Sequence, residues 1–206
     1  MLQKFMLHGI MQSLKPLYCS QMAQGIKTNE IRKSFPKELK APFTVFVYCT
    51  KGGGSLFVKH GNDFLGHWES LVSGKVIGQY TCTGRTIYEP VIKDEKVTYD
   101  ISDEEVATTC VTREEIEAYG NGKTIYFWHV TDFVVYDEPK DLNVFCSSVC
   151  QWLSSGGCKL LGETCSYQPQ CFAGDVEPCV KRFVRPPQSW TYAILHPNDR
   201  RKNRII

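Results

Sequence analysis

The chain has 206 residues, of which 42% are hydrophobic and 22% are charged, a composition typical of a soluble globular protein and unlike that of a disordered or fibrous one. This length allows one domain with an elaboration, or two small domains. The net charge of +2 conceals two basic segments, at 27–40 and from 181 onward, around an acidic segment at 89–117. This pattern favours a polyanionic partner, although solvated faces without a function carry such charges too.

The chain contains ten cysteines, six of them between 146 and 179. No apolar run approaches the ~20 residues of a membrane-spanning helix, and the N-terminal segment lacks the small-residue cleavage site of a secretory signal. We therefore expect a cytoplasmic protein without membrane association. In that compartment, clustered cysteines favour metal binding or reduced thiols over disulfides.

The first predicted elements are a strand over 5–14 and a short helix that begins at Pro16 and ends before Gly25. Proline suits the first helical position because its missing N–H has no intrahelical partner there, and glycine suits the left-handed stop. One helical face collects apolar residues with the spacing i, i+3, i+4 and i+8: Leu14, Leu17, Tyr18 and Met22.

Strands are predicted next over 28–33, 43–50 and 75–82, with a further one at 55–60. The segment 43–50 is the clearest of them, because it is β-branched and aromatic throughout. Gly78 lies inside a strand pattern, which marks a bulge or a close approach of another backbone. A polar stretch up to residue 100 shows no element.

Two helices are predicted to start after Ser102 and Thr112, each a capping residue followed by acidic residues in the first turn. The segment 124–136 predicts two strands, or one long bent strand, with a break near 129–131. The segment 143–185 predicts irregular structure, and a last strand is expected over 188–195. Strands dominate, helices are short and no Gly-rich phosphate loop occurs, so we expect a mixed or antiparallel barrel with helices at its rim and no nucleotide cofactor.

The polar residues of the segment 13–36 are the first candidates for a functional site. On a strand Glu30 and Arg32 share a face about 7 Å apart, and Lys27 lies in the turn before them. A carboxylate between two cations holds their side chains in place for a phosphate, a carbonyl or a base edge, and a lysine near Arg32 and Lys33 can have a lowered pKa. A solvated strand with surface ion pairs is the alternative.

The spacing Gly25-x-Lys27-x-x-Glu30-x-Arg32 resembles the G-x-K-x-x-E-x-R signature of ASCH domains, which have a PUA-like barrel fold. Further segments follow in order over nearly the whole chain and are similar to an ASCH-type group often encoded by bacteriophages and prophages: FTVFVYCTKG, KVIGQYTC, TREEIEAYG, WHVTDFVVYDEPKDL and RPPQSWTYAI. The resemblance implies an α+β protein, a PUA-like mixed β-barrel with short rim helices and a cysteine-rich irregular insertion. We expect the barrel at 1–142 with 186–195, the insertion at 143–185 and a basic tail at 196–206.

The same resemblance implies a cleft lined by the signature residues, with RNA or a nucleotide derivative as its ligand. Some ASCH proteins are small hydrolases that act on acylated cytidine or on RNA. The amidohydrolases among them have a threonine where Glu30 stands here, and Thr28 falls at a different spacing. Lys27 and Glu30 are the candidate catalytic residues, with Glu115 or Glu117 as a possible general base. The candidate ligand-binding residues are Lys15, Lys27, Thr28, Glu30, Arg32, Lys33 and Trp190.

The cysteine cluster is the second candidate site. It contains no CxxC pair, which makes it less specific than a zinc ribbon, but a segment poor in apolar residues needs something to order it, and a structural zinc ion does so in many cytoplasmic domains. The candidate ligands are two cysteines from each end of the segment: Cys146, Cys150, Cys171 and Cys179. Reduced thiols, or disulfides formed after purification, are the alternatives.

Trp190 and Tyr192 alternate onto one face of the last predicted strand, where exposed rings would stack on bases and buried rings would belong to the core. The first functional hypothesis is a cytoplasmic protein, in a host cell if phage-encoded, that binds RNA or a modified nucleoside. The second is a hydrolase that uses Lys27 with a carboxylate on a nucleoside amide or an RNA phosphodiester. The third is a zinc-stabilised protein-interaction module.

Overall fold

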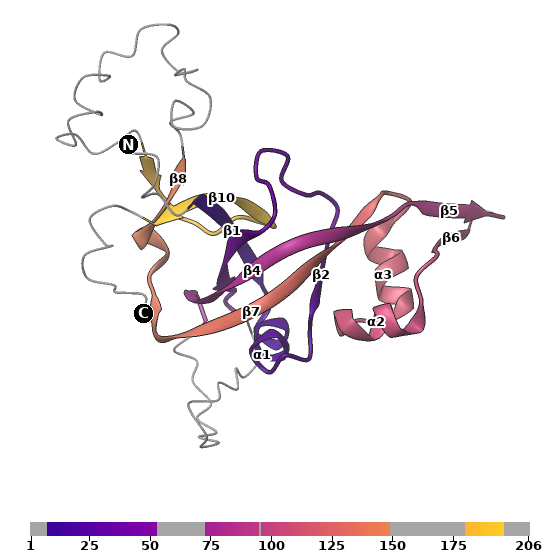
Figure 1. Ribbon diagram of the computed structural model, residues 1–206, viewed down its shortest axis with the longest axis horizontal. Coiled ribbons are helices and arrows are strands. Elements are labelled where there is room, and N and C mark those ends of the chain that lie inside the picture. The colour runs from indigo at the N-terminus through magenta and orange to yellow at the C-terminus, as the bar shows by residue number, and fades with distance from the viewer. Residues whose placement is uncertain (1–7, 53–72, 95, 149–179, 196–206) are drawn as a thin grey trace, which may run out of the picture.

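The computed structural model describes residues 8–52, 73–94, 96–148 and 180–195 (Figure 1). Its class is α+β with strands in the majority, as predicted. The elements in chain order are β1 (His8–Leu14), α1 (Pro16–Ala23), β2 (Asn29–Arg32), β3 (Phe43–Cys49), β4 (Lys75–Tyr88), β5 (Pro90–Lys93), β6 (Lys96–Tyr99), α2 (Asp103–Thr109), α3 (Arg113–Gly120), β7 (Ile125–Lys140), the 3₁₀ helix η3 (Leu142–Val144), β8 (Phe145–Ser148), β9 (Val180–Arg182) and β10 (Trp190–Leu195).

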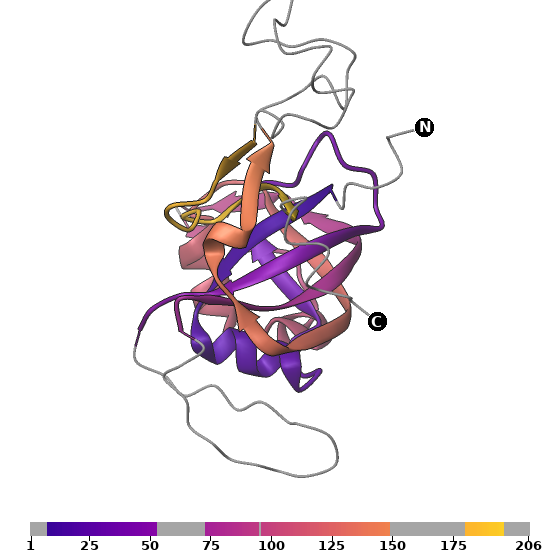
Figure 2. The ribbon, with the colours of Figure 1, turned by 90° about the vertical axis from the view of Figure 1, so that its left-hand side faces the viewer.

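Eight of the described strands form one sheet, in the order β2-β7-β4-β3-β1-β10-β8-β9. The sheet is mixed: β1 runs parallel to β3 and antiparallel to β10. The sheet also curls, so that edge strand β2 comes close to β1 and β10. Arg32 on β2 donates hydrogen bonds to the carbonyl of Ser13 in β1 and to the hydroxyl of Ser189 just before β10. Figure 2 shows this curled arrangement of the strands.

The curled sheet is buried on both faces in its centre. Phe43, Val45, Val47 and Cys49 of β3 point into an inner core, which α1 closes from one side with Cys19 and Met22. The alternate residues Phe46 and Tyr48 pack into a second cluster with Phe145 of β8. The apolar run of β3 therefore has a physical reason, since a strand buried on both faces has no polar side.

The helix boundaries follow the predicted capping. Pro16 is the first residue of α1, and Gly25 adopts a left-handed φ of +71° just beyond its end. Ser102 and Thr112 both form complete capping boxes, with Glu105 and Glu115 as the reciprocal partners. A third core cluster lies between α3, β6 and β7, with Ile116, Tyr99 and Phe127 among its members.

The structure differs from the prediction in two segments. Strand β4 continues to Tyr88 and is followed by the β5–β6 hairpin, although polar composition suggested no element there. The segment 124–136 forms one long strand, β7, which is one of the two predicted alternatives; it reaches Lys140 and shows register shifts against β4 near the predicted break. Strands β8 and β9 extend the sheet into both ends of the segment predicted to be irregular, 143–185. The predicted strand at 55–60 lies outside the described residues, as do 149–179 and the tail 196–206.

No helix in the described part of the chain is long and apolar enough to cross a membrane.

Candidate ligand cavity

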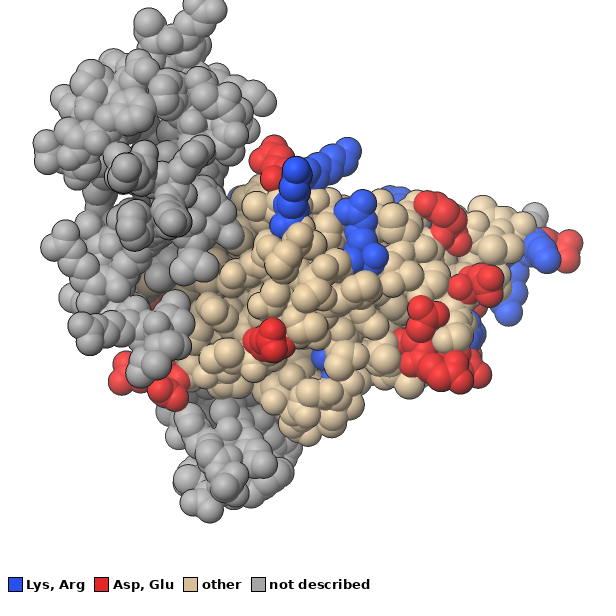
Figure 3. Space-filling view, viewed as in Figure 1, with Lys and Arg blue, Asp and Glu red and all other residues tan. Residues whose placement is uncertain are grey.

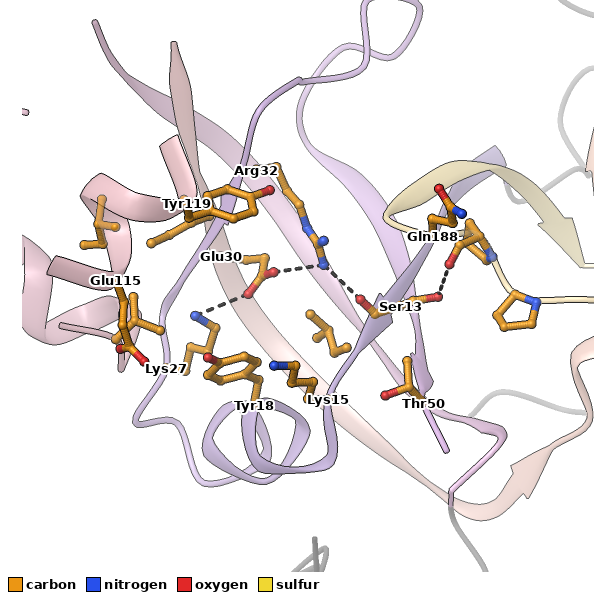
Figure 4. A pocket seen from close by; sticks show the side chains of 16 residues that line it. Ser13, Lys15, Tyr18, Lys27, Glu30, Arg32, Thr50, Glu115, Tyr119 and Gln188 are labelled. Atoms are coloured by element: carbon orange, nitrogen blue, oxygen red, sulfur yellow. Dashed lines mark hydrogen bonds and ion pairs between the residues drawn. The ribbon is translucent and has the colours of Figure 1, made fainter. Parts of the chain in front are cut away.

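A cavity of about 600 Å³ opens where α1, the end of β1, β2 and α3 meet the segment that leads into β10. Figure 4 shows Glu115 and Tyr119 at one end and Gln188 at the other, with the predicted polar residues between them. Its volume lies in the range of small-molecule sites. The lining residues are Ser13, Leu14, Lys15, Tyr18, Lys27, Glu30, Ile31, Arg32, Thr50, Val111, Glu115, Ile116, Tyr119, Pro186, Pro187 and Gln188.

Lys27 lies at the floor of the cavity and is only 2% exposed. The left-handed Gly25 turns the chain back so that the amides of Ile26 and Lys27 both donate to the carbonyl of Gln21. The Lys27 ammonium group then donates to the Thr109 carbonyl and lies 3.2 Å from Glu30 Oε2. Two of its three N–H donors are thus engaged by protein oxygens, and these contacts hold the ammonium group in place.

Arg32 completes a buried ion triad with Lys27 and Glu30. Its Nη2 lies 2.9 Å from Glu30 Oε1 and donates to the Ser13 carbonyl at 3.0 Å. Its Nη1 donates to the Ser189 hydroxyl at 3.2 Å. The Arg32 Nε is buried and has no hydrogen-bond partner in the described part of the chain. The Nε–H of the guanidinium is therefore a buried donor without a partner among the described residues.

The triad has a net charge of +1, since one carboxylate is shared by two cations. Glu30 and Arg32 are 6% and 9% exposed, so water screens this charge poorly. A buried charge without a counter-ion is unfavourable unless a partner neutralises it. The floor of the cavity is therefore suited to an anionic or strongly polar ligand group.

The rim adds groups that are not fully engaged. Lys15 is exposed and lies beside the cavity at the start of α1. Glu115 Oε2 accepts a hydrogen bond from the Thr112 amide in the capping box. The other carboxylate oxygen has no partner among the described residues. Burial, and then the charges of Glu115 and Glu30, raise the pKa of the Tyr18 phenol. Both carboxylates therefore lie near Tyr18.

Tyr119 forms the opposite aromatic wall, on α3 (Figure 4). Burial is the main cause of its raised pKa, so the phenol stays protonated and able to donate a hydrogen bond at neutral pH. Lys33 lies outside the cavity with its ammonium group 4.8 Å from the centre of the Tyr119 ring. Lys33 therefore contacts the ring without lining the cavity.

The cavity contains four of the seven predicted ligand-binding residues: Lys15, Lys27, Glu30 and Arg32. Lys33, Thr28 and Trp190 do not line it. Thr28 is exposed, and its backbone bonds to Thr108 and Val130. Trp190 packs on Trp128 with a ring separation of 5.6 Å and donates to the Ser34 hydroxyl, so its ring belongs to the edge of the inner core.

Neither tyrosine wall was predicted from the sequence, and neither was the contribution of the segment 186–188. Tyr18 falls on the apolar face predicted for α1, which indicated a core residue, and nothing in the sequence connected Tyr119 with Lys27. Glu115 was a candidate general base, and the structure brings it to the same cavity as Lys27. Glu117 does not line the cavity.

The zinc prediction falls mostly on residues that the structure does not describe, Cys150, Cys171 and Cys179. Cys146 is buried in β8. Within the described ranges no three His, Cys, Asp or Glu side chains lie close enough together to hold a metal ion. The zinc site stays a prediction, and metal analysis of protein purified without chelators tests it, with about one zinc ion per chain as the expected result.

No family model and no curated protein matches the chain. Among solved structures, the chain is similar to ASCH from Zymomonas mobilis, with 14% identity, a TM-score of 0.49, and coverage of 94% of this chain and 92% of that one. It is also similar to the structure of a point mutant of that protein, with 14% identity, a TM-score of 0.48, and coverage of 94% of both chains.

Proposed function

We propose that the cavity binds a nucleotide unit, either in RNA or as a modified nucleoside, and that the chain is an ASCH-type protein of the kind that phages encode. One observation carries the proposal: a buried triad of net charge +1 lies at the floor between two tyrosine walls. The cationic floor suits a phosphate or a base carbonyl, and the aromatic walls suit a base. The signature spacing of Lys27, Glu30 and Arg32 supports the same ligand class.

The triad itself acts as a fixed scaffold in this proposal. Two of the three donors of Lys27 and three of the five of Arg32 are engaged by protein oxygens, so their geometry is set before a ligand arrives. Preorganised charges need no rearrangement on binding, which favours affinity. The adjustable contacts come from the rim: Lys15, Glu115 and the two phenols.

Lys15→Ala tests the proposal with the least risk to folding, because Lys15 is exposed and makes no side-chain cap to α1. We expect this substitution to weaken binding of a nucleoside 5′-monophosphate and of short RNA by at least about tenfold, since one charge-assisted hydrogen bond contributes about 1.5–3 kcal/mol. Titration calorimetry measures both ligands. Lys37→Ala, which removes an exposed charge outside the cavity, is the control. Equal affinities of wild type and Lys15→Ala would contradict the proposal.

A hydrolase is the second candidate, favoured by the presence of Glu115 and Lys27 in one cavity. A carboxylate on one side of a substrate and a fixed cation on the other are the parts of general-base hydrolysis with a stabilised oxyanion. Glu115→Gln keeps the capping box, because glutamine also fills that position, and removes the base. We expect this variant to lose hydrolysis of N-acylcytidine, or cleavage of RNA, while still binding the ligand. If the wild-type protein binds these ligands but hydrolyses neither substrate, the hydrolase candidate is wrong and only the binding function remains.

A further inference from the structure

A second cavity of about 650 Å³ lies directly beside the first. Thr50, just after β3, and Pro186, just before β10, line both cavities. The two therefore share a wall and form neighbouring compartments of similar size. The second is lined by Tyr48, Thr50, Lys51, Gly74, Asp141, Leu142, Asn143, Phe183, Val184, Arg185 and Pro186.

Two cations face this second cavity from the side of the shared wall. Lys51 follows Thr50 in the chain, and its aliphatic stem lies against Gly74, where a Cβ atom would come within 2.9 Å of Lys51 Cε. Arg185 precedes Pro186 and is exposed. The carboxylate in the lining, Asp141, is paired with Lys75 at the surface. The positive charges of Lys51 and Arg185 thus dominate next to Thr50 and Pro186, the two residues that line both cavities.

The second cavity also has apolar surface, beside the polar side chains of Thr50 and Asn143. Val184 is 87% exposed, and Phe183, Leu142 and Pro186 supply further apolar surface around it. Exposed apolar surface next to two cations matches the two parts of a nucleotide, a base and a phosphate. Free nucleoside in the first cavity would leave all of these groups unused.

We propose that the second cavity holds the neighbouring nucleotide of a single-stranded nucleic acid whose first nucleotide occupies the cavity over the Lys27–Glu30–Arg32 triad. This inference rests on the proposed function and selects a polymer, instead of a free nucleoside, as the ligand. The connecting phosphate passes Thr50 and Pro186, where Lys51 and Arg185 neutralise it. Two separate compartments suit a single strand, whose unstacked bases can be turned apart, and exclude a base-paired duplex.

Affinity as a function of ligand length tests the inference. The probes are 5′-phosphorylated oligouridylates of one, two, four and eight nucleotides, measured by titration calorimetry, with an eight-base-pair RNA duplex for comparison. We expect the dinucleotide to bind at least about tenfold more tightly than the mononucleotide, because it engages a second base and a bridging phosphate. We expect the duplex to bind more weakly than the single strand of the same length.

The double variant Lys51→Ala/Arg185→Ala is expected to remove most of the gain from one to two nucleotides and to leave mononucleotide affinity unchanged. Lys93→Ala/Lys96→Ala in the exposed β5–β6 hairpin removes the same charge outside both cavities and serves as the control. Equal affinities for one and two nucleotides, an equal loss in the control variant, or stronger binding of the duplex would each overturn the inference.

The same titrations separate this inference from the proposed function. Mononucleotide binding that depends on Lys15, without any gain from a second nucleotide, would overturn the second cavity alone. If Lys15→Ala leaves oligonucleotide affinity unchanged while Lys51→Ala/Arg185→Ala lowers it, the first cavity is not a binding site. That result would also contradict a ligand that runs from one cavity to the other.

Discussion

At the residue scale, the arrangement of Lys27, Glu30 and Arg32 separates structural from binding roles. The carboxylate of Glu30 receives both cations at 3.2 Å and 2.9 Å, and all three side chains are nearly inaccessible to water. A surface strand with ion pairs, the alternative that spacing alone allowed, does not describe them. The triad is a buried polar network, which stabilises the fold only while every member keeps its partners.

Glu30→Gln is therefore expected to lower the free energy of unfolding by about 3–5 kcal/mol, because it leaves two buried cations without a counter-charge. Chemical denaturation at neutral pH measures the change. Glu38→Gln, an exposed carboxylate in the next segment, is the control, with an expected effect within about 0.5 kcal/mol. A change in Glu30→Gln no larger than that of the control would show that the triad does not stabilise the fold.

At the element scale, the long strands β4 and β7 approach each other so closely that only glycine fits at position 78. A Cβ atom there would lie 2.3 Å from the Val134 carbonyl oxygen and 3.2 Å from the Val135 Cα. The register of the two strands also shifts between Val76 and Gly78. The close backbone approach predicted from the sequence is thus confirmed, and its partner is β7.

Gly78→Ala is expected to destabilise the protein by about 1–3 kcal/mol, because the backbone of a paired strand must move to admit the methyl group. Gly84→Ala in the same strand is the matched control, since its Cβ would meet nothing closer than the His129 Nδ1 at 3.4 Å. Thermal or chemical unfolding compares the two variants. Equal stability of both would contradict the close packing of β4 against β7.

The start of α2 provides a pH-dependent contact. Tyr88 donates a hydrogen bond to Glu105 and is the main cause of the lowered pKa of that carboxyl group, and the capping interactions with Ser102 lower it further. Because the pKa of Glu105 is lower in the folded than in the unfolded state, the unfolded state binds more protons near pH 4. The stabilisation is therefore complete above the ordinary pKa of about 4.3 and is lost as pH falls through the folded-state pKa.

Glu105→Gln is expected to reduce stability at pH 7, and its difference from wild type should shrink steadily as the pH falls below about 4.3. Denaturant midpoints measured between pH 7 and pH 3 give this difference directly. Glu104→Gln, the exposed neighbour within α2, should differ little from wild type over the same range. A difference between Glu105→Gln and wild type that stays constant with pH would contradict the assigned contact.

At the scale of the whole molecule, charge is distributed unevenly. Acidic side chains gather at the α2–α3 end, among them Asp103, Glu104 and Glu114 (Figure 3). The cations that line the two cavities lie instead on β2 and in the segments after β1, α1, β3 and β9. A nucleic acid is expected to meet the cavities and to avoid the helical end, because its phosphates are repelled by the acidic cluster.

The tail 196–206 adds four basic residues, Arg200, Arg201, Lys202 and Arg204, against Asp199. Removing the tail is expected to lower RNA affinity at 50 mM salt and to make the salt dependence shallower, by up to about 3 units in the slope of log K against log salt. Binding titrations between 50 and 200 mM salt measure this slope. A tail with glutamine at the four basic positions keeps the length and should behave like the truncation. An unchanged slope in both variants would show that the tail makes no phosphate contacts.

Local chemistry along the chain was enough to predict most elements and the triad. The capping boxes at Ser102 and Thr112, Pro16 and Gly25 around α1, and the apolar run of β3 act over a few residues, so their meaning does not depend on the rest of the fold. The β5–β6 hairpin was not predicted from the sequence, because its strands are short and bury little apolar surface. Composition does not distinguish such strands from loops.

The cavities depend on contacts between residues far apart in the chain. The curl of the sheet brings Arg32 to Ser13 and Ser189, and it carries Pro186–Gln188 to the mouth of the first cavity. Packing of α3 against β6 and β7 brings Glu115 and Tyr119 to the same cavity as Lys27. Spacing in the sequence indicates which side chains share an element. Only the curl of the sheet decides which elements face one another, because that curl is selected by burial of the whole core at once.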